Sequence, residues 1–162
     1  MPFTPSLDIS IRFRADAEIV WAALVDKKLR RDWWPHVRIR TPETSSKVTG
    51  KGDFSLVNPE KERSWSRAEA SGSITKIKAP RKIRADLVSQ PGGFETALRI
   101  DLTQLERKTK LQLVEQGFPE GRHCERIVAE CRDWWRAMLE ALDDYLAEPE
   151  NVERIERRIR AG

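Results

Sequence analysis

Long apolar runs and closely spaced cysteines are missing from this sequence. No stretch of its 162 residues approaches the ~20 apolar residues that a helix needs to cross a bilayer. Residues 1–5 show no basic segment followed by an apolar run, so we expect no signal peptide. Cys124 and Cys131 lie seven apart, about 10 Å along a helix, which is too far for a disulfide. These absences predict a cytoplasmic protein in a reducing compartment.

Charge of one sign is also scarce. The chain has 30 basic and 26 acidic residues, and its net charge is +4. Acidic and basic residues alternate along the chain, as in residues 60–63 (Glu-Lys-Glu-Arg). Nucleic-acid binders usually gather their positive charge in a patch. We therefore expect no nucleic acid and no membrane as partners.

Sequence motifs of catalysis are absent as well. There is no glycine-rich phosphate loop, no Gly-x-Ser-x-Gly and no His-Glu-x-x-His. The histidines, His36 and His123, do not fit a standard zinc spacing together with Cys124 and Cys131. We predict no catalytic residue, no metal and no cofactor, and this favours a role that is not enzymatic while leaving an enzyme open.

Alternating and helical patterns make up most of the chain. Residues 7–14 alternate between apolar and polar side chains, which predicts a half-buried strand. Two short helices follow, at about 16–25 and 26–34, and Pro35 ends the second. Residues 41–51 are predicted to be a loop, and residues 58–68 a loop or a weak hairpin around Trp65. Further strands are predicted at 37–40, 53–57, 70–78, 82–88, 94–102 and 108–116.

A long apolar stripe predicts one helix over about 124–146, roughly 35 Å in length. One helix covers so large a sheet only if the sheet curls around it. We predict an α+β helix-grip fold in which a curved antiparallel sheet of about six to seven strands wraps around a long C-terminal helix. Residues 1–148 would form one domain, and 149–162 a charged tail, a short helix that adds little to the core. The predicted stripe consists of Ile127, Cys131, Trp134, Trp135, Met138, Leu142, Tyr145 and Leu146.

Several phrases, in this order, resemble the START-like helix-grip superfamily, the SRPBCC group that includes polyketide cyclases and birch-pollen-allergen-like proteins. The branch they resemble most is named for activators of the heat-shock protein 90 ATPase. The resemblance covers residues 7–147 and implies a fold more firmly than an activity. Where the family often has Gly-Trp and a histidine, this chain has Trp134-Trp135 and Glu115. The phrases are residues 15–26 (ADAEIVWAALVD), 33–35 (WWP), 72–74 (GSI), 79–83 (APRKI), 94–96 (FET) and 111–119 (LQLVEQGFP).

Glu115 is the most suggestive single residue. The alternation of Leu111 and Leu113 places position 115 on the inward face of its strand. A buried carboxylate must find a partner or lose its charge. Two interpretations stay open, a solvated strand end and a polar anchor for a ligand. If Glu115 is an unpaired anchor, Glu115→Gln should weaken binding without destabilising the fold.

The tryptophans also allow two interpretations, core packing or the lining of a cavity between sheet and helix. Three functions remain in order of preference. The first is binding of a small hydrophobic or amphipathic molecule. The second is a chaperone-cofactor-like domain that binds a protein, with a homodimer left open. The third is a polyketide cyclase- or aromatase-like enzyme. The cavity candidates are Glu115, Trp33, Trp34, Trp65, Phe54, Leu98, Leu113, Trp135 and Met138.

Overall fold

The computed structural model describes residues 5–40, 52–57 and 67–161, without the side chains of Arg38 and Arg40. Its strands and helices follow the predicted order. They are β1 (Ser6–Phe13), α1 (Ala17–Val25), α2 (Lys27–Trp33), β2 (Val37–Arg40), β3 (Gly52–Val57), β4 (Arg67–Lys78), β5 (Lys82–Pro91), β6 (Glu95–Leu105), β7 (Lys108–Gln116), α3 (Cys124–Ala147) and α4 (Pro149–Ala161).

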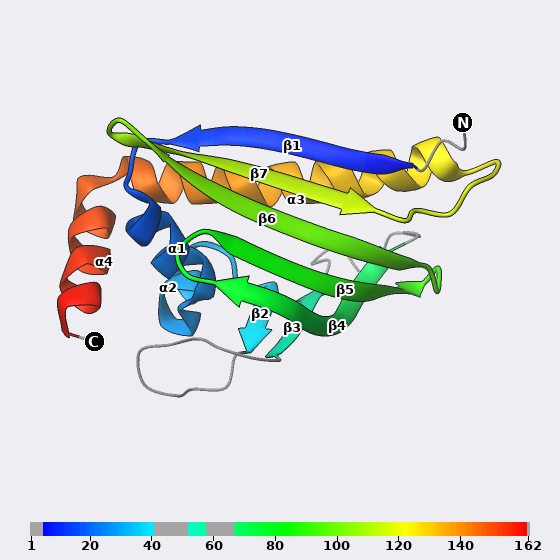
Figure 1. Cartoon of the computed structure of the whole chain (residues 1–162), viewed down its shortest axis with the longest axis horizontal. Helices are drawn as coiled ribbons and strands as arrows, with labels where there is room; N and C mark the ends of the chain where they lie inside the picture. Colours follow the sequence, from blue (N-terminus) through cyan, green and yellow to red (C-terminus); the bar gives the residue numbers. More distant parts are fainter. Residues whose placement is uncertain (1–4, 41–51, 58–66, 162) are drawn as a thin grey trace.

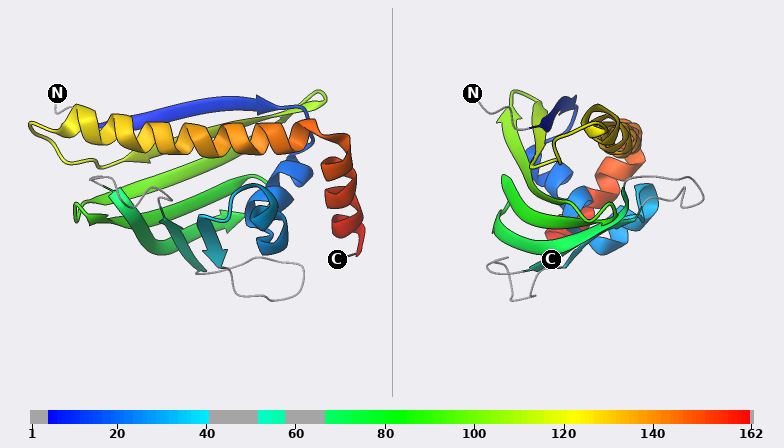
Figure 2. Two further views of the ribbon diagram at one scale, coloured as in Figure 1. Left: turned by 180° about the vertical axis from the view of Figure 1, so that it is seen from behind. Right: turned by 90° about the vertical axis from the view of Figure 1, so that its right-hand side faces the viewer.

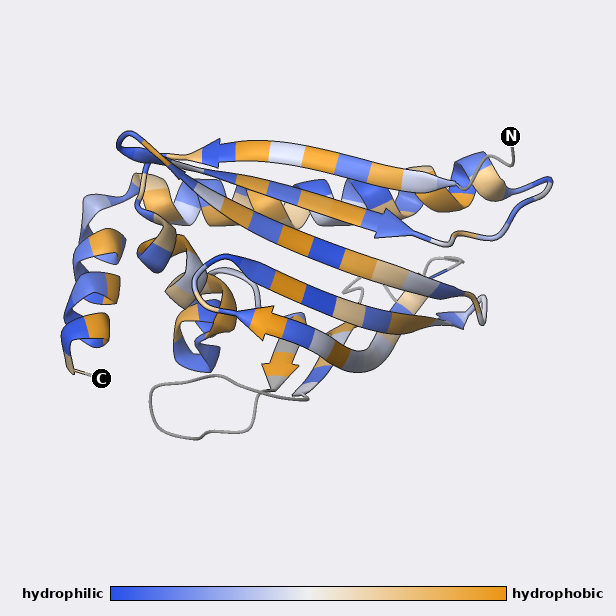
Figure 3. Cartoon of the chain, viewed as in Figure 1, coloured by the Kyte–Doolittle hydropathy of each residue, from blue (hydrophilic) through white to orange (hydrophobic). Residues whose placement is uncertain are grey.

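The strands of the described residues form one seven-stranded sheet in the order β1-β7-β6-β5-β4-β3-β2, and every neighbouring pair is antiparallel (Figure 1). The alternation of side chains decides which face is buried. In β1, for example, Leu7 and Ile9 are buried while Asp8 and Ser10 are exposed. Figure 3 shows this alternation along the strands. One face of the sheet is therefore apolar and receives α3.

The sheet curves around α3, which runs along its concave face (Figure 2). Strand β4 has irregularities in its register at Arg67/Glu69 and at Ile74/Lys76, and β-bulges bend and twist a strand. Between them, Gly72 lies so close to β5 that a Cβ would come within 1.7 Å of the Asp86 carbonyl oxygen. Only glycine permits this approach. The helix-grip fold predicted from the sequence is confirmed.

Helix α3 extends over nearly the predicted range, but its buried face is rotated slightly. Ile127, Trp134 and Tyr145 are only half-buried, whereas Val128 and Leu139 are buried and were not predicted. A sheet that curls around a helix contacts a wide arc of it, and the sequence indicates only the approximate centre of that arc. The buried side chains are Val128, Cys131, Trp135, Met138, Leu139, Leu142 and Leu146.

Helix α4 turns away from the axis of α3 at the end of that helix and lies beside α1 (Figure 1). Its Ile155 is fully buried. Arg154 forms an ion pair of 2.6 Å with Asp32 of α2, and Arg158 forms another with Asp26. The predicted helix is present, but the expectation that it adds little to the core is wrong, since it supplies a core residue and two ion pairs.

Some predicted boundaries also differ. Residues 67 and 68 were predicted as loop but belong to β4, and β5 and β6 continue beyond 88 and 102. The predicted loop at 41–51 and Trp65 lie outside the described residues. Within the described ranges, no helix is both long and apolar enough to cross a membrane.

Candidate functional site

Glu115 lies in β7, where Leu7 of β1 and Leu98 of β6 are its neighbours across the sheet. Its side chain is fully buried. The inward orientation predicted from the alternation is therefore confirmed, and a solvated strand end is excluded. A role in holding a ligand remains a prediction.

The carboxylate of Glu115 is fully paired by side chains from three other elements. Both terminal nitrogens of Arg67 donate to it, Nη1 to Oε1 at 3.0 Å and Nη2 to Oε2. Thr96 donates its hydroxyl to Oε2 at 2.5 Å, and Trp135 donates its indole N–H to Oε1 at 2.9 Å. Arg67 also donates from Nε to the hydroxyl of Ser89 at 2.9 Å. The sequence-based picture of an unpaired anchor is wrong.

Burial and the ion pair shift the pKa values of Arg67 and Cys131. Burial is the largest single influence and acts to lower the pKa of Arg67, but the charge of Glu115, its hydrogen bonds and the nearby Cys131 together raise the pKa, so the guanidinium stays protonated. That guanidinium also lies 5.7 Å from the centre of the Phe94 ring. Burial raises the pKa of the Cys131 thiol to about 12, although Arg67 opposes the shift. Cys131 is thus a neutral buried side chain and a poor nucleophile.

The pairing changes the expectation for Glu115→Gln. A neutral amide would leave the buried guanidinium of Arg67 without its counter-charge, and breaking a buried pair is strongly destabilising. The variant should therefore unfold more easily than the wild type, contrary to the sequence-based expectation.

Arg67, Ser89 and Thr96 were not among the predicted site residues. Arg67 was missed because it falls in a segment read as a loop. The sequence did hold a signal for the others, because Ser89 and Thr96 continue the inward series of their strands two residues from Leu87 and Leu98. When several adjacent strands each end their run of inward apolar residues with a polar residue, a polar layer is expected at that end of the core.

An aromatic cluster leads from the surface to this pair, and we define it as Trp34, His36, Phe54, Trp134 and Trp135. The rings of Trp34 and His36 are 5.3 Å apart, those of Trp34 and Trp134 are 5.7 Å apart, and those of Trp134 and Trp135 are 4.9 Å apart. Phe54 packs on Trp135 at 6.5 Å. The cluster therefore joins the end of α2, the start of β2, and β3 to the middle of α3.

Two indole N–H groups of the aromatic cluster have no acceptor. In the part of the chain that the structure describes, Nε1 of Trp34 and Nε1 of Trp134 are buried and make no hydrogen bond. Trp33 and Trp135, in contrast, donate to the Ala23 carbonyl at 3.0 Å and to Glu115. A buried donor without a partner costs about 1–3 kcal/mol. Trp34 and Trp134 therefore each keep an unused hydrogen-bond donor.

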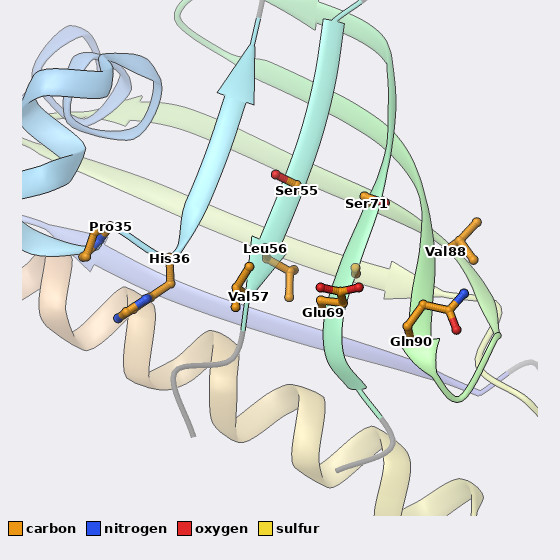
Figure 4. Close-up of a pocket in the computed structure, with 10 residues that line it drawn as sticks. Pro35, His36, Ser55, Leu56, Val57, Glu69, Ser71, Val88 and Gln90 are labelled. Atoms are coloured by element: carbon orange, nitrogen blue, oxygen red, sulfur yellow. The ribbon is translucent and has the colours of Figure 1, made fainter. Parts of the chain in front are cut away.

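A hollow of about 430 Å³ adjoins the aromatic cluster at His36 (Figure 4). Strands β3, β4 and β5 form its floor, and Glu69 and Gln90 contribute polar groups to its wall. Its other lining residues are Pro35, Ser55, Leu56, Val57, Ala70, Ser71 and Val88.

The remaining cavity candidates fall into three groups. Leu98, Leu113 and Met138 are buried in the hydrophobic core, and Leu98 faces Glu115 across β6 and β7. Trp33 is also buried, but its indole bonds to α1, so it packs the helices together. Trp65 lies outside the described residues. The structure thus brings Glu115, Phe54, Trp34 and Trp135 into one connected set.

Several solved structures share this fold. CalU16 from Micromonospora echinospora is 21% identical, with a TM-score of 0.64 over 98% of this chain and 85% of its own. The Aha1 dimer from Colwellia psychrerythraea is 17% identical, with a TM-score of 0.62 over 87% and 95%. PFC0360w, an HSP90 activator from Plasmodium falciparum, is 20% identical, with a TM-score of 0.61 over 89% and 97%. At these identities the likeness establishes the fold alone.

A search of curated proteins gives no match. The family described as "Activator of Hsp90 ATPase homolog 1-like protein" does match, over residues 14–147. This range includes both partners of the Arg67–Glu115 pair and ends before α4 begins at Pro149. With its helix-grip fold, the chain belongs to the Aha1-like branch of the SRPBCC superfamily.

Proposed function

We propose that this protein binds a small amphipathic molecule at the aromatic cluster. The observation that carries the proposal is the pair of buried, unpartnered indole donors on Trp34 and Trp134. Buried polar groups in native proteins nearly always have partners, so a group without one needs an explanation. A ligand that supplies acceptors explains both donors at once.

The chemistry of the cluster defines the ligand class. Aromatic side chains of α3, of β3 and of the segment between α2 and β2 offer apolar surface, and such surface supplies most of the binding free energy of ligand sites. The free donors require a carbonyl, hydroxyl or carboxylate oxygen on the ligand. Glu115 is not available to the ligand, because its own partners occupy it. We therefore expect a flat, largely apolar molecule with one or two oxygen acceptors.

The first test is native mass spectrometry of the purified protein, followed by titration of any molecule that co-purifies, monitored by tryptophan fluorescence. Trp34→Phe and Trp134→Phe each keep a ring but remove the donor. Each variant should weaken binding about fivefold, because one hydrogen bond contributes about 1 kcal/mol. Trp21→Phe, in α1 and outside the cluster, is the matched control and should bind like wild type. If Trp34→Phe and Trp134→Phe both bound the molecule as tightly as the wild type and the control, the proposal would be contradicted.

Binding of a protein partner is the second candidate function. Membership in a family named for Hsp90 activators favours it, as does the likeness to an HSP90 activator from Plasmodium falciparum. The direct measurement is the rate of ATP hydrolysis by an Hsp90 with and without this protein. If the rate of ATP hydrolysis is unchanged and a ligand binds at the aromatic cluster, only the first candidate function, ligand binding, remains.

The described residues do not favour an enzyme at this site. General acid–base catalysis needs a titratable group that can exchange a proton with the substrate. Glu115 and Arg67 bind each other, and Cys131 is held neutral. His36 is titratable, but within the described ranges no hydrogen bond orients its imidazole. We therefore rank a cyclase-like activity below the two binding functions.

A further inference from the structure

The outer, convex face of the sheet carries a concentration of positive charge that the sequence does not reveal. The cations come from five strands, β1 and β4 to β7, which lie side by side in the sheet. They occupy the end of the sheet at the turn between β4 and β5. We define the basic band as Arg12, Lys76, Lys78, Lys82, Arg99 and Lys110.

The register places these cations directly opposite other cations. Lys78 faces Lys82 across β4 and β5. Arg84, which lies among the band residues on β5, faces Lys76 on one side and Arg99 on the other. Like charges directly opposite each other in a sheet are destabilising. A face selected for stability alone would alternate its charges, so another role must account for this arrangement.

Few of these charges are neutralised within the molecule. Asp101 accepts from Arg84 at 2.8 Å and lies 3.6 Å from Arg99. In the described ranges, no ion pair is recorded for Arg12, Lys110 or the band lysines of β4 and β5. The band therefore presents most of its positive charge to whatever lies outside the sheet.

The same face changes sign toward its other end. There, Asp86 and Glu95 line a hollow of about 760 Å³ whose floor holds the small residues Gly72, Ser73 and Ala97. Val88, one of the few exposed large apolar side chains of the described chain, lines the same hollow with 38% of its surface accessible. The outer face thus combines a basic band, an acidic end and an apolar side chain at a hollow.

From this pattern we propose that the outer face of β4–β7 binds a protein whose contact surface carries carboxylates opposite the basic band and cations opposite Asp86 and Glu95. The basic band lies on the side of the sheet away from α3, whereas Trp34 and Trp134 belong to the aromatic cluster. The hollow at His36 shares Val88 with the hollow at Asp86 and Glu95, so the two proposed sites are distinguished by the cations of the band and not by the face of the sheet. The outer face would give the protein-binding candidate its contact surface, and it does not require that the partner be an Hsp90.

A long polyanion fits this face less well than a protein. A nucleic acid or an anionic bilayer is uniformly negative and would meet the acidic end as well as the basic band, where repulsion opposes the attraction. Asp101 also places a carboxylate among the cations. A partner of mixed charge satisfies both ends, and complementary charge patterns are what fix partner choice and orientation at protein interfaces.

The test uses two labelled peptides of equal length, one all acidic and one with an acidic block followed by a basic block, with fluorescence anisotropy as the readout. The mixed peptide should bind more tightly. Its affinity should fall steeply between about 50 and about 200 mM salt, because screening weakens exposed charges. The double variant K82Q/K110Q should bind at least tenfold more weakly. K27Q/R136Q, with equal charge loss on exposed helix positions, is the matched control and should bind like wild type.

Folding does not confound this test. Removing Lys82 and Lys110 relieves their opposition to Lys78 and Arg12, so K82Q/K110Q should melt no lower than wild type. The proposal is overturned if the control loses as much affinity as K82Q/K110Q. It is also overturned if wild type binds neither peptide, or if the all-acidic peptide, duplex DNA or anionic vesicles bind as tightly as the mixed peptide. None of these outcomes bears on the aromatic cluster, because ligand binding there is measured separately.

Discussion

At the scale of single residues, the Arg67–Glu115 pair is the most consequential contact in the core. Moving two opposite charges out of water costs free energy. The bidentate contact between them and the added hydrogen bonds from Thr96 and Trp135 offset that cost. Such a pair adds little to the free energy of unfolding compared with two apolar residues in its place. Removing only one partner, however, lowers that free energy strongly, because a buried charge is left unpaired. Its contribution is therefore best measured with single and double variants together.

Arg67→Met should lower the free energy of unfolding by about 3–5 kcal/mol, because it leaves Glu115 buried and without its counter-charge. The double variant R67M/E115L should recover most of that loss, since both charges are then absent. Urea denaturation of the wild type, the two single variants and the double variant measures the coupling. If Arg67→Met were as stable as the wild type, water would have to reach the carboxylate of Glu115 and replace the lost partner.

At the scale of secondary structure elements, α4 is the element whose role differs most from the sequence-based prediction. It lies beyond the part of the chain that matches the family, yet it buries Ile155 and pairs with both ends of α2. Helix α2 ends at Trp33, directly before Trp34 of the aromatic cluster. Through Asp26 and Asp32, α4 therefore helps to position the segment that presents one of the free indole donors.

Truncation after Glu148 should destabilise the protein. Burying one isoleucine side chain contributes about 1.5–3 kcal/mol, and the ion pairs to α2 are lost with it. The measurement is thermal unfolding of the truncated chain, with Ile155→Ala as the variant that removes the side chain alone. A melting temperature equal to that of the full chain would show that α4 does not hold its docked position in solution.

The ion pair of Asp26 and Arg158 should make stability depend on pH. Burial alone would raise the pKa of Asp26, but the hydrogen bond and charge of Arg158, together with bonds from the Lys28 and Leu29 amides, lower the pKa below the ordinary 3.8. The contribution is therefore fully present above about pH 4, where Asp26 is charged in both the folded and the unfolded chain, and it is lost as the pH falls through the folded pKa.

Arg158→Gln should accordingly cost about 0.5–1 kcal/mol at neutral pH, and the difference from wild type should disappear at low pH. Arg157→Gln, an exposed neighbour with no ion pair recorded in the described chain, is the control. Chemical denaturation across the acid range measures both. A difference that persists below the folded pKa of Asp26 would assign the effect to packing of the Arg158 stem.

At the scale of the whole molecule, folding gathers charges that the sequence disperses. Arg12, Lys76 and Lys110 are separated by tens of residues, and acids lie between them along the chain. The antiparallel register sets β1, β7, β6, β5 and β4 side by side and turns these side chains to one face. A chain whose composition is nearly balanced thereby acquires an outer face with one basic end and one acidic end.

The sequence by itself determined the fold and the inward orientation of Glu115. Period-two alternation and a long apolar stripe are local signals, and they decide which residues face the core before any long-range contact is known. They indicated the curved sheet, the order of its elements and the helix it surrounds. They also placed Leu113 on the inward face of its strand and Trp135 and Met138 on the apolar stripe, and all three are buried.

Only the tertiary structure decided what those residues meet. Arg67 reaches Glu115 across 48 positions of sequence, and Trp34 meets Trp134 across the gap between α2 and α3. The docking of α4 and the basic band depend in the same way on elements distant in the chain. Pairings of this kind depend on strand register, on bulges such as those in β4, and on how helices cross. These are properties of the packed molecule that local periodicity does not encode.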